Sequence, residues 1–483
     1  MYLNVFTQCS PSPQFKGFWR HPADRSATGY RSLEYWTDLA TRLEQACVDA
    51  LFFADIHGAY DVYRGSWQTA VKHAVQIPSI DPALVIPACA AVTRSLGFAV
   101  TYSTTYHPPY ECARLFSSLD HLTRGRIGWN IVTSYLRSAE GNGLGCYLDH
   151  DERYDRADEY VAVARALWEQ SWETGAVVRD AATDTFADPA MVHEVNHAGR
   201  WFSVRGPHQC EPSPQRTPVL YQAGASSRGL DFAARHAEVV FLTLSDPASG
   251  RPQVEELRAR VAKFGRDPAG IKALQGTMVM VGEDRAEARQ RAEDYVRLWS
   301  GEGQLAKWCG WMDVDLAAYP DDTPVSEING QGSRSFVGFL KRLSPDREWT
   351  VADVRYLVAT PRRPRRNSPV TLFGTVGEVA DRIEEWLETA GVDGFNLIPC
   401  PTTQGIDDIC DRLVPELQRR GLFRTAYDPA ETTLRERYFG AGNRGCMAAP
   451  MEPAEEAARE PAREPAQRAA QEPAQRLSAS AVG

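Results

Sequence analysis

Eight short apolar runs recur along the chain, separated by longer stretches in which apolar residues return at helical spacing. Each run is almost continuously hydrophobic, which is typical of a strand covered by other elements on both faces. The predicted strands are residues 3–8, 50–56, 96–103, 126–134, 219–224, 238–244, 276–282 and 394–399.

Amphipathic helices are predicted between most of these strands. Thr375 and Glu378 form a capping box, apolar residues follow on one face, and Gly391 ends the helix. Residues 30–53 and 151–172 contain similar apolar faces. Strands that alternate with helices pair in parallel, so eight of them favour a closed (β/α)8 TIM barrel. An open, doubly wound sheet is the alternative.

The chain is longer than a minimal barrel of about 250 residues, so the excess is assigned to insertions. They are expected near 57–90, 174–218 and 301–370 of one domain that spans 1–445. Residues 446–483 contain mainly Ala, Glu, Pro, Arg and Gln, and "EPA" recurs among them. Such a segment buries little apolar surface and is predicted to be a disordered tail.

Charge and composition narrow the class of protein. The 483 residues carry a net charge of −10, and the basic residues form no long stripe, so a nucleic-acid surface is not expected. No apolar stretch is long enough for a membrane span, and no signal peptide is apparent, so a soluble, cytoplasmic protein is expected. The ten cysteines are scattered without a C-x-x-C pair, which indicates reduced thiols.

Polar residues gather where the predicted strands end. The carboxyl ends of parallel barrel strands form the catalytic face of a TIM barrel, so these side chains are expected to line a binding site. A Ser or Thr at any one of these positions could instead cap the following turn. The residues concerned are Gln8, Cys9, Asp55, Thr101, Ser103, Asn130, Thr133, Ser134 and 222–227.

The segment "QAGASSRGLDFAARHAE" (222–238) carries the sharpest single signal. A strand ends, small residues permit a tight turn, and Ser226 or Ser227 begins a helix at the predicted rim. The free N–H groups at such a helix start bind phosphate. An ordinary serine N-cap is the alternative.

Four motifs in this order resemble the flavin-dependent monooxygenases of the bacterial-luciferase-like superfamily. They are "FFADIHGAYDVY", "GRIGWNIVTS", "HDERYDRADEYVAVARALWE" and "VLYQAGASSRG". Within that superfamily the chain is similar to the group of nitrilotriacetate monooxygenase component A, dibenzothiophene sulfone monooxygenase, pristinamycin IIA synthase and long-chain alkane monooxygenase. The similarity extends from residue 1 to about 425 and is densest in 1–240.

The resemblance implies a two-component monooxygenase that uses O2 and reduced FMN, supplied transiently by a separate NAD(P)H-dependent flavin reductase. The flavin C4a-hydroperoxide would oxygenate a small organic molecule at C, N or S, in catabolism or specialised metabolite biosynthesis. The resemblance also implies a homodimer or homotetramer. The implied FMN-binding residues are Asp55, Thr101 and Ser103 beside the isoalloxazine, Asn130 at the pyrimidine edge, His150 and Tyr154 on the ribityl-phosphate side, Ser226 and Ser227 at the phosphate, and Tyr60, Gln76 and Arg153 along the pocket.

Two histidines are candidates for moving protons, because histidine is the side chain that titrates near neutral pH without special help. They are His21 in "WRHP" and His107 in "TYHPPY". A structural role is the alternative for each. Nearby aromatic residues are candidates for walls that exclude water from the flavin; they are Phe18, Trp19, Tyr63, Trp67 and Tyr106.

Three further motifs are set aside as sites. "HEVNH" (193–197) matches a zinc motif but lies between Pro189 and Gly199, where a stable helix is not expected, so no metal is predicted. No helix opens directly after "GNGLG" (141–145), and no acidic residue follows a second strand at the spacing of a dinucleotide site. The arginines of "PRRPRRNSP" (361–369) suit a solvated loop or, alternatively, contact with an anionic substrate or the reductase.

Other enzyme classes stay open at this stage. A deazaflavin-dependent hydride transferase could use the same barrel, a flavin-binding protein without catalysis would keep the same rim, and a zinc hydrolase is the remaining alternative. The substrate is expected to depend on the insertions at 57–90 and 301–370, where motifs are weakest.

Overall fold

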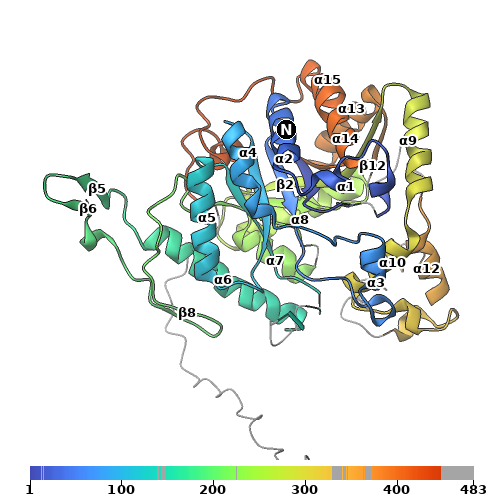
Figure 1. Cartoon of the computed structure of the whole chain (residues 1–483), viewed down its shortest axis with the longest axis horizontal. Coiled ribbons are helices and arrows are strands. Elements are labelled where there is room, and N and C mark those ends of the chain that lie inside the picture. Colours follow the sequence, from blue (N-terminus) through green and yellow to red (C-terminus); the bar gives the residue numbers. More distant parts are fainter. Residues whose placement is uncertain are drawn as a thin grey trace, which may run out of the picture.

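Eight parallel strands pair edge to edge into a closed ring, as the (β/α)8 prediction requires (Figure 1). The ring closes where β13 pairs with β1, which excludes an open sheet. Every strand coincides with a predicted apolar run, because a strand covered on both faces needs apolar side chains at most positions. The ring runs through β1 (Tyr2–Gln8), β2 (Ala50–Ala54), β3 (Gly97–Ser103), β4 (Ile127–Val132), β9 (Val219–Gln222), β10 (Val239–Leu242), β11 (Lys272–Gly282) and β13 (Gly394–Pro399).

This computed structural model describes residues 1–447 apart from 12, 15, 137, 139–140, 143–147, 225, 329–339, 341–343, 345, 363 and 365–370. Nearly all of the predicted tail at 446–483 therefore lies outside the described residues. The same holds for most of the arginine cluster at 361–369 and for the second half of "GNGLG".

One further parallel strand is not predicted by the sequence pattern. β12 (Thr371–Thr375) pairs with the carboxyl half of β11, outside the closed ring. β11 is long enough to reach past β10, so its second half offers a free edge that β12 occupies. The short run "TLFGT" contains only two large apolar side chains, which is why its apolar signal is weak.

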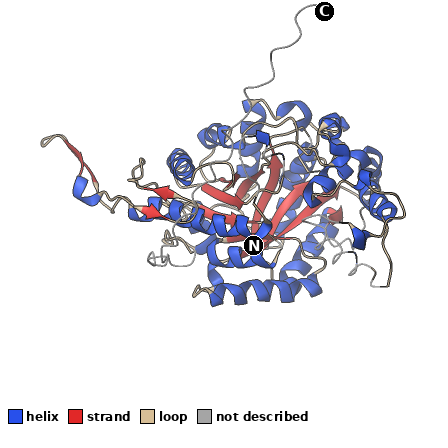
Figure 2. Ribbon diagram, turned by 90° about the horizontal axis from the view of Figure 1, so that it is seen from below, coloured by secondary structure: helices blue, strands red, loops and turns tan. Residues whose placement is uncertain are grey.

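Helices surround the strands, as Figure 2 shows. The predicted capping box of Thr375 and Glu378 is present at the start of α13, and Gly391 follows the helix with a positive φ. The helices are α1 (Ser26–Gly29), α2 (Leu33–Gln45), α3 (Gln68–Lys72), α4 (Ile86–Val92), α5 (Pro109–Thr123), α6 (His150–Gln170), α7 (Ser227–His236), α8 (Pro247–Lys263), α9 (Arg285–Leu298), α10 (Gly301–Met312), α12 (Val351–Ala359), α13 (Val376–Glu385), α14 (Thr402–Asp408), α15 (Val414–Arg419) and α16 (Leu434–Phe439). In the described part of the chain, no helix is long and apolar enough to cross a membrane.

The segments expected as insertions contain secondary structure of their own. Residues 57–90 include α3 and α4, and residues 301–370 include α10 and α12. α10 packs against both α3 and α12, and these three helices form one group at the side of the barrel (Figure 1). Residues 174–218 form an arm that extends away from the barrel, with two small hairpins of β5 (Val177–Asp180) with β6 (Thr185–Ala187) and β7 (His197–Ala198) with β8 (Ser203–Val204).

The short helix α16 closes the amino end of the barrel. Tyr438 on α16 donates a hydrogen bond to Asn4 Oδ1 at 2.9 Å and accepts one from Tyr221 at 3.0 Å. Its neighbour Arg435 pairs with Glu238 at the start of β10, and both side chains are 0% exposed. Burial alone would raise the pKa of Glu238, but Arg435 holds it below its usual value. A buried pair of this kind anchors α16 as long as both partners remain.

Replacing Arg435 by Met should lower the free energy of unfolding by about 3–5 kcal/mol, because Glu238 stays buried without a cation. Urea denaturation of the variant and the parent protein measures the difference. Arg297→Met, which breaks an exposed pair with Asp294, is the matched control and should change stability by less than about 0.5 kcal/mol. Adding Glu238→Gln to Arg435→Met should recover part of the loss; a double variant no better than the single one would contradict this account.

Candidate active site

The carboxyl ends of the eight ring strands meet at one rim of the barrel, because all the strands run in the same direction. Polar residues follow directly on several of these ends, including Gln8 on β1, Asp55 on β2, Ser103 on β3 and Gln222 on β9. Hydrogen bonds and ring contacts join several of the predicted residues at this rim.

A hydrogen-bonded chain joins the ends of β1 and β4 through the insertion at 57–90. Gln76 Nε2 donates to Gln8 Oε1 at 2.7 Å, and Tyr60 Oη donates to Gln76 Oε1 at 2.7 Å. The Tyr60 hydroxyl also lies 2.6 Å from that of Tyr135. Gln76 adopts a φ of 56°, a strained conformation for a residue other than glycine, and such strain often marks a functional site.

The adjacent strands β3 and β4 place two further polar pairs at the rim. Thr101 and Asn130 are register partners, and Asn130 Nδ2 donates to Thr101 Oγ1 at 2.8 Å. Ser103 Oγ lies 2.7 Å from Ser134 Oγ, and Ser134 adopts a φ of 51°. Asn130 Oδ1 is buried and accepts no hydrogen bond. An amide acceptor of this kind can accept a hydrogen bond from a ligand's imide N–H, because a buried polar atom without a partner is costly.

A carboxyl group and two imidazoles lie beyond β2 and β3. Asp55 Oδ2 is 3.9 Å from His57 Nδ1, and the His57 ring stacks on that of Tyr106. Burial raises the pKa of Asp55 to about 6, although His57 and the Ile56 N–H both lower it. Asp55 therefore changes its charge close to neutral pH, as a proton-transfer group must.

The two predicted proton-transfer histidines lie in different surroundings. His107 stacks on Tyr102 with a ring distance of 4.4 Å, and its edge faces His57. Its Nε2 is buried without a hydrogen bond, and burial together with His57 lowers its pKa. His21 instead accepts a hydrogen bond from the Ala23 N–H, and Asp294 and Arg297 of α9 influence its pKa, which burial lowers. Of the two histidines, His107 is the one near Asp55, because His57 contacts both residues.

Tyr154 on α6 links the end of β4 to the start of α7. Burial raises the pKa of its phenol, while hydrogen bonds with Ser226 and Thr133 lower it. Ser226 is the N-cap of α7 and accepts from the Gly229 N–H at 3.0 Å. A Cβ at Gly229 would lie 2.8 Å from Tyr154 Oη, and one at Gly224 would lie 3.0 Å from it. The glycines therefore allow the backbone to approach Tyr154 closely at a helix start.

The remaining predicted residues surround this helix start with different orientations. The His150 ring packs against the Tyr154 ring with a centroid distance of 5.2 Å, and His150 Nδ1 is hydrogen-bonded to Asp151 Oδ1. Arg153 donates to the Leu148 carbonyl at 3.0 Å. Ser227 is exposed, and its hydroxyl accepts a hydrogen bond from Arg260 at 3.3 Å. Ser226 thus faces Tyr154, whereas Ser227 faces Arg260 on α8.

Sequence reasoning misses three rim residues that contact the predicted ones. His57 contacts Asp55 and His107, and Tyr135 contacts Tyr60. Gln8 contacts Gln76; the sequence marks it as the end of a strand but does not assign it to the pocket. His57 immediately follows a strand end, so its position was a usable signal. The aromatic residues predicted to exclude water fall into two groups. Phe18 and Tyr63 are buried in core clusters, whereas Trp19 and Trp67 are exposed.

The imidazoles of "HEVNH" do not converge. His193 pairs with Glu173 and His197 pairs with Glu159, and His197 begins the strand β7. Among the described residues, no cluster of His, Cys, Asp or Glu suits a metal ion. The described cysteines are free.

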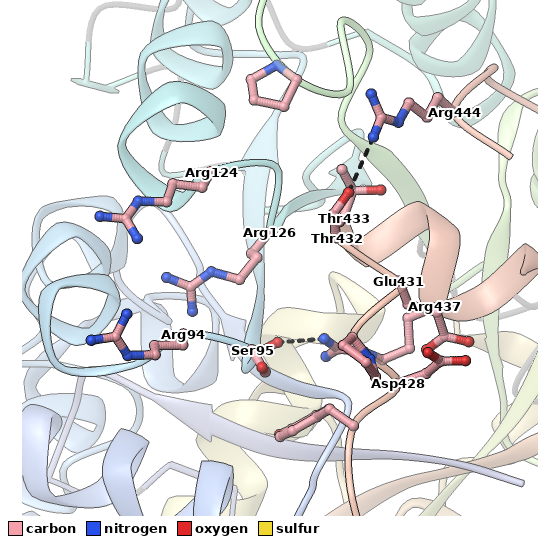
Figure 3. A pocket seen from close by; sticks show the side chains of 13 residues that line it. Arg94, Ser95, Arg124, Arg126, Asp428, Glu431, Thr432, Thr433, Arg437 and Arg444 are labelled. Carbon is pink, nitrogen blue, oxygen red and sulfur yellow. Dashed lines mark hydrogen bonds between the residues drawn. The ribbon is translucent and has the colours of Figure 1, made fainter. Parts of the chain in front are cut away.

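A cavity of about 490 Å³ lies at the opposite, amino end of the barrel (Figure 3). Its innermost arginines bind main-chain carbonyls rather than open space. Arg126 donates to the carbonyls of Ala90, Thr93, Leu96 and Thr123, and Arg437 donates to those of Asp49 and Ser95. These contacts hold loops together at the face of a TIM barrel that serves stability, so the carboxyl rim is the candidate active site.

Comparison with known proteins agrees with the resemblance noted in the sequence. Residues 16–394 match the family model described as luciferase-like monooxygenase. The long-chain alkane monooxygenase of Geobacillus thermodenitrificans (strain NG80-2) is 45% identical over 92% of this chain and 95% of the relative. Nitrilotriacetate monooxygenase component A of Aminobacter aminovorans is 34% identical over 90% and 95%. The crystal structure of a riboflavin lyase with modified FMN and riboflavin superimposes with a TM-score of 0.82 at 33% identity, covering 92% and 97%.

Asp55→Asn should stabilise the protein at high pH only. The folded-state pKa of Asp55 is about 6, above the value of about 3.9 for an unfolded Asp, so the folded state binds the proton more tightly. The resulting contribution to stability is present at low pH and is lost as pH rises through 6. We expect a gain of up to about 3 kcal/mol at about pH 7.5 and none below about pH 4, measured by urea denaturation.

Asp322→Asn, which neutralises an exposed carboxylate, serves as the control and should leave stability unchanged at both pH values. Equal effects of Asp55→Asn at high and low pH would contradict the raised pKa.

Proposed function

The chain belongs to the luciferase-like monooxygenase family and is a flavin-dependent monooxygenase; we propose that it is the oxygenase component of a two-component system. In this proposal it binds reduced FMN supplied by a separate NAD(P)H-dependent flavin reductase, and with O2 it oxygenates a small organic molecule. The observation that carries the proposal is the position of Asp55, Asn130 and Tyr154, together with the start of α7, at the carboxyl rim of the barrel. The designation of one relative as component A supports the two-component arrangement.

The rim residues fit FMN in three respects. Asn130 Oδ1 is a buried acceptor without a partner, which suits the imide N–H of the flavin pyrimidine. The start of α7, with the hydroxyl of Ser226, offers N–H donors and a positive dipole end to the phosphate. Gly224 and Gly229 allow the start of α7 to lie close to the Tyr154 hydroxyl, which is a further donor for the phosphate. The similar riboflavin lyase, whose crystal structure contains modified FMN, supports this choice of cofactor.

Reduced FMN, when bound, would supply the activation of dioxygen. The residues of this chain bind and orient it: Thr101, Ser103 and Asn130 at the ring system, and Tyr154 with Ser226 at the phosphate end. The helices α3 and α10 are the roof of the proposed site. Together with Tyr60 and Gln76, this roof excludes water from the side of the rim next to β1. Asp55, with His57 and His107 beside it, is the group that holds or releases a proton near neutral pH.

Combining Tyr154→Phe with Ser226→Ala and Ser227→Ala should raise the dissociation constant of FMN at least about tenfold, since hydrogen bonds to a charged group contribute about 1.5–3 kcal/mol each. Quenching of FMN fluorescence on titration with protein measures the constant, and circular dichroism checks the fold. Ser249→Ala removes an exposed hydroxyl at the start of α8 and should leave the constant unchanged. An unchanged constant in the triple variant would remove the phosphate assignment.

The proposed use of oxygen is tested by supplying reduced FMN from a purified flavin reductase with NADH and recording O2 consumption. A substrate from a panel of alkanes, sulfides and amines should couple that consumption to an oxygenated product. A deazaflavin-dependent hydride transferase on the same barrel would instead reduce or oxidise its substrate without consuming O2. Flavin binding with no turnover of any substrate would favour a binding protein without catalysis.

A further inference from the structure

One face of α10 in the 301–370 segment lies against residues that reach the barrel rim. Gly303, Lys307 and Gly310 are spaced four and three residues apart, so they share this face. A Cβ at Gly310 would clash with the Tyr60 ring, and one at Gly303 would lie 3.1 Å from both His73 Cβ and Lys16 Cβ. The two glycines therefore allow α10 to approach closely, with Lys307 between them.

The contacts of this face place Lys307 beside the segment that follows β1. Lys307 Nζ donates to Gln14 Oε1 at 3.4 Å, and Gln14 lies in the segment that follows β1. One turn further along α10, Gly310 contacts Tyr60, which hydrogen-bonds to Gln76 and through it to Gln8. The ammonium group is thus part of the roof next to the proposed site.

The charge of Lys307 has no acidic counterpart among the described residues. Its one hydrogen bond goes to the neutral amide of Gln14, and none of the described ion pairs includes it. Burial lowers the pKa of Lys307 to about 8, so the amine keeps its charge at neutral pH. A second lysine, Lys16, is fully buried near it and donates to the Pro13 carbonyl. A partly buried positive charge without an anion still carries a desolvation cost, which indicates a role in binding one.

We propose that Lys307 binds a carboxylate group of the substrate, so that the substrate is a small organic acid with an apolar body. This inference rests on the proposed function, because it assigns the substrate class of that same site. A single ammonium beside an amide suits one carboxylate, whereas bidentate recognition would use arginine. The rest of the roof is apolar, with Leu305, Ala306 and Cys309 of α10 buried in one cluster with Tyr60 and Tyr63. Lys307 itself is partly accessible, so a ligand can reach it.

The test compares ligands that differ only in charge: octanoate against octanol, and methylthioacetate against methylthioethanol. Isothermal titration calorimetry gives their dissociation constants for the parent protein, Lys307→Met and Lys307→Arg, each with and without FMN. The parent should bind the acid of each pair more tightly. Lys307→Met should weaken binding of the acids about tenfold or more, because a charge-assisted hydrogen bond is lost, and change binding of the alcohols less than about twofold. Lys307→Arg should retain most of the preference.

Lys72→Met is the matched control, since it removes the same charge from an exposed position on the neighbouring helix α3. It should leave all four constants unchanged. Equal weakening of acids and alcohols in Lys307→Met, or a parent protein that binds neither acid more tightly than its alcohol, would overturn the proposal. A separate fluorescence titration measures FMN binding. A parent protein that binds no FMN would overturn the proposed function. If that protein still preferred the acids, Lys307 would remain an anion site.

Discussion

Closure of the parallel sheet is the constraint on which the rest of the structure depends. The pairing of β13 with β1 turns an open sheet into a ring, and the common strand direction then brings every carboxyl end to one rim. Residues as distant in sequence as Gln8, Asn130 and Ser226 lie at the same rim for this reason. Backbone hydrogen bonds around the ring hold those positions, so the rim side chains can be chosen for chemistry rather than for stability.

The two ends of the barrel divide these tasks. At the amino end, Arg435 pairs with Glu238 and Arg126 binds four main-chain carbonyls, so these buried charges are matched there. At the carboxyl end, Asn130 Oδ1 and His107 Nε2 are buried without partners, Asp55 has a raised pKa, and Gln76 and Ser134 adopt strained backbone angles. Each of these features costs stability, and together they mark the rim as the place where a ligand completes the structure.

The roof helices α3 and α10 form a further layer next to the rim. α3 and α10 come from separate insertions, yet they pack together because Gly303 and Gly310 permit close contact with Lys16, His73 and Tyr60. An insertion can change without disturbing the ring, since it contributes no ring strand. This separation explains how one barrel can keep a common cofactor site while its roof determines which substrate is accepted.

The sequence by itself determined the elements and their order. Apolar runs covered on both faces identified all eight ring strands, and the capping box of Thr375 with Glu378 identified a helix start, because these signals depend on neighbouring residues alone. Strand ends also pointed to Asp55, Asn130 and the α7 start as a common rim. β12 was not predicted, because its pairing depends on the free edge of β11 rather than on its own weak apolar run.

Only the tertiary structure decided how side chains meet across long separations. It turned Ser226 toward Tyr154 and Ser227 toward Arg260, placed His107 next to His57 and His21 beside α9, and set Lys307 against Gln14, 293 residues away. The raised pKa of Asp55 likewise follows from burial by residues that its own strand does not contain. Such contacts depend on packing between elements, and no local pattern of residues encodes that packing.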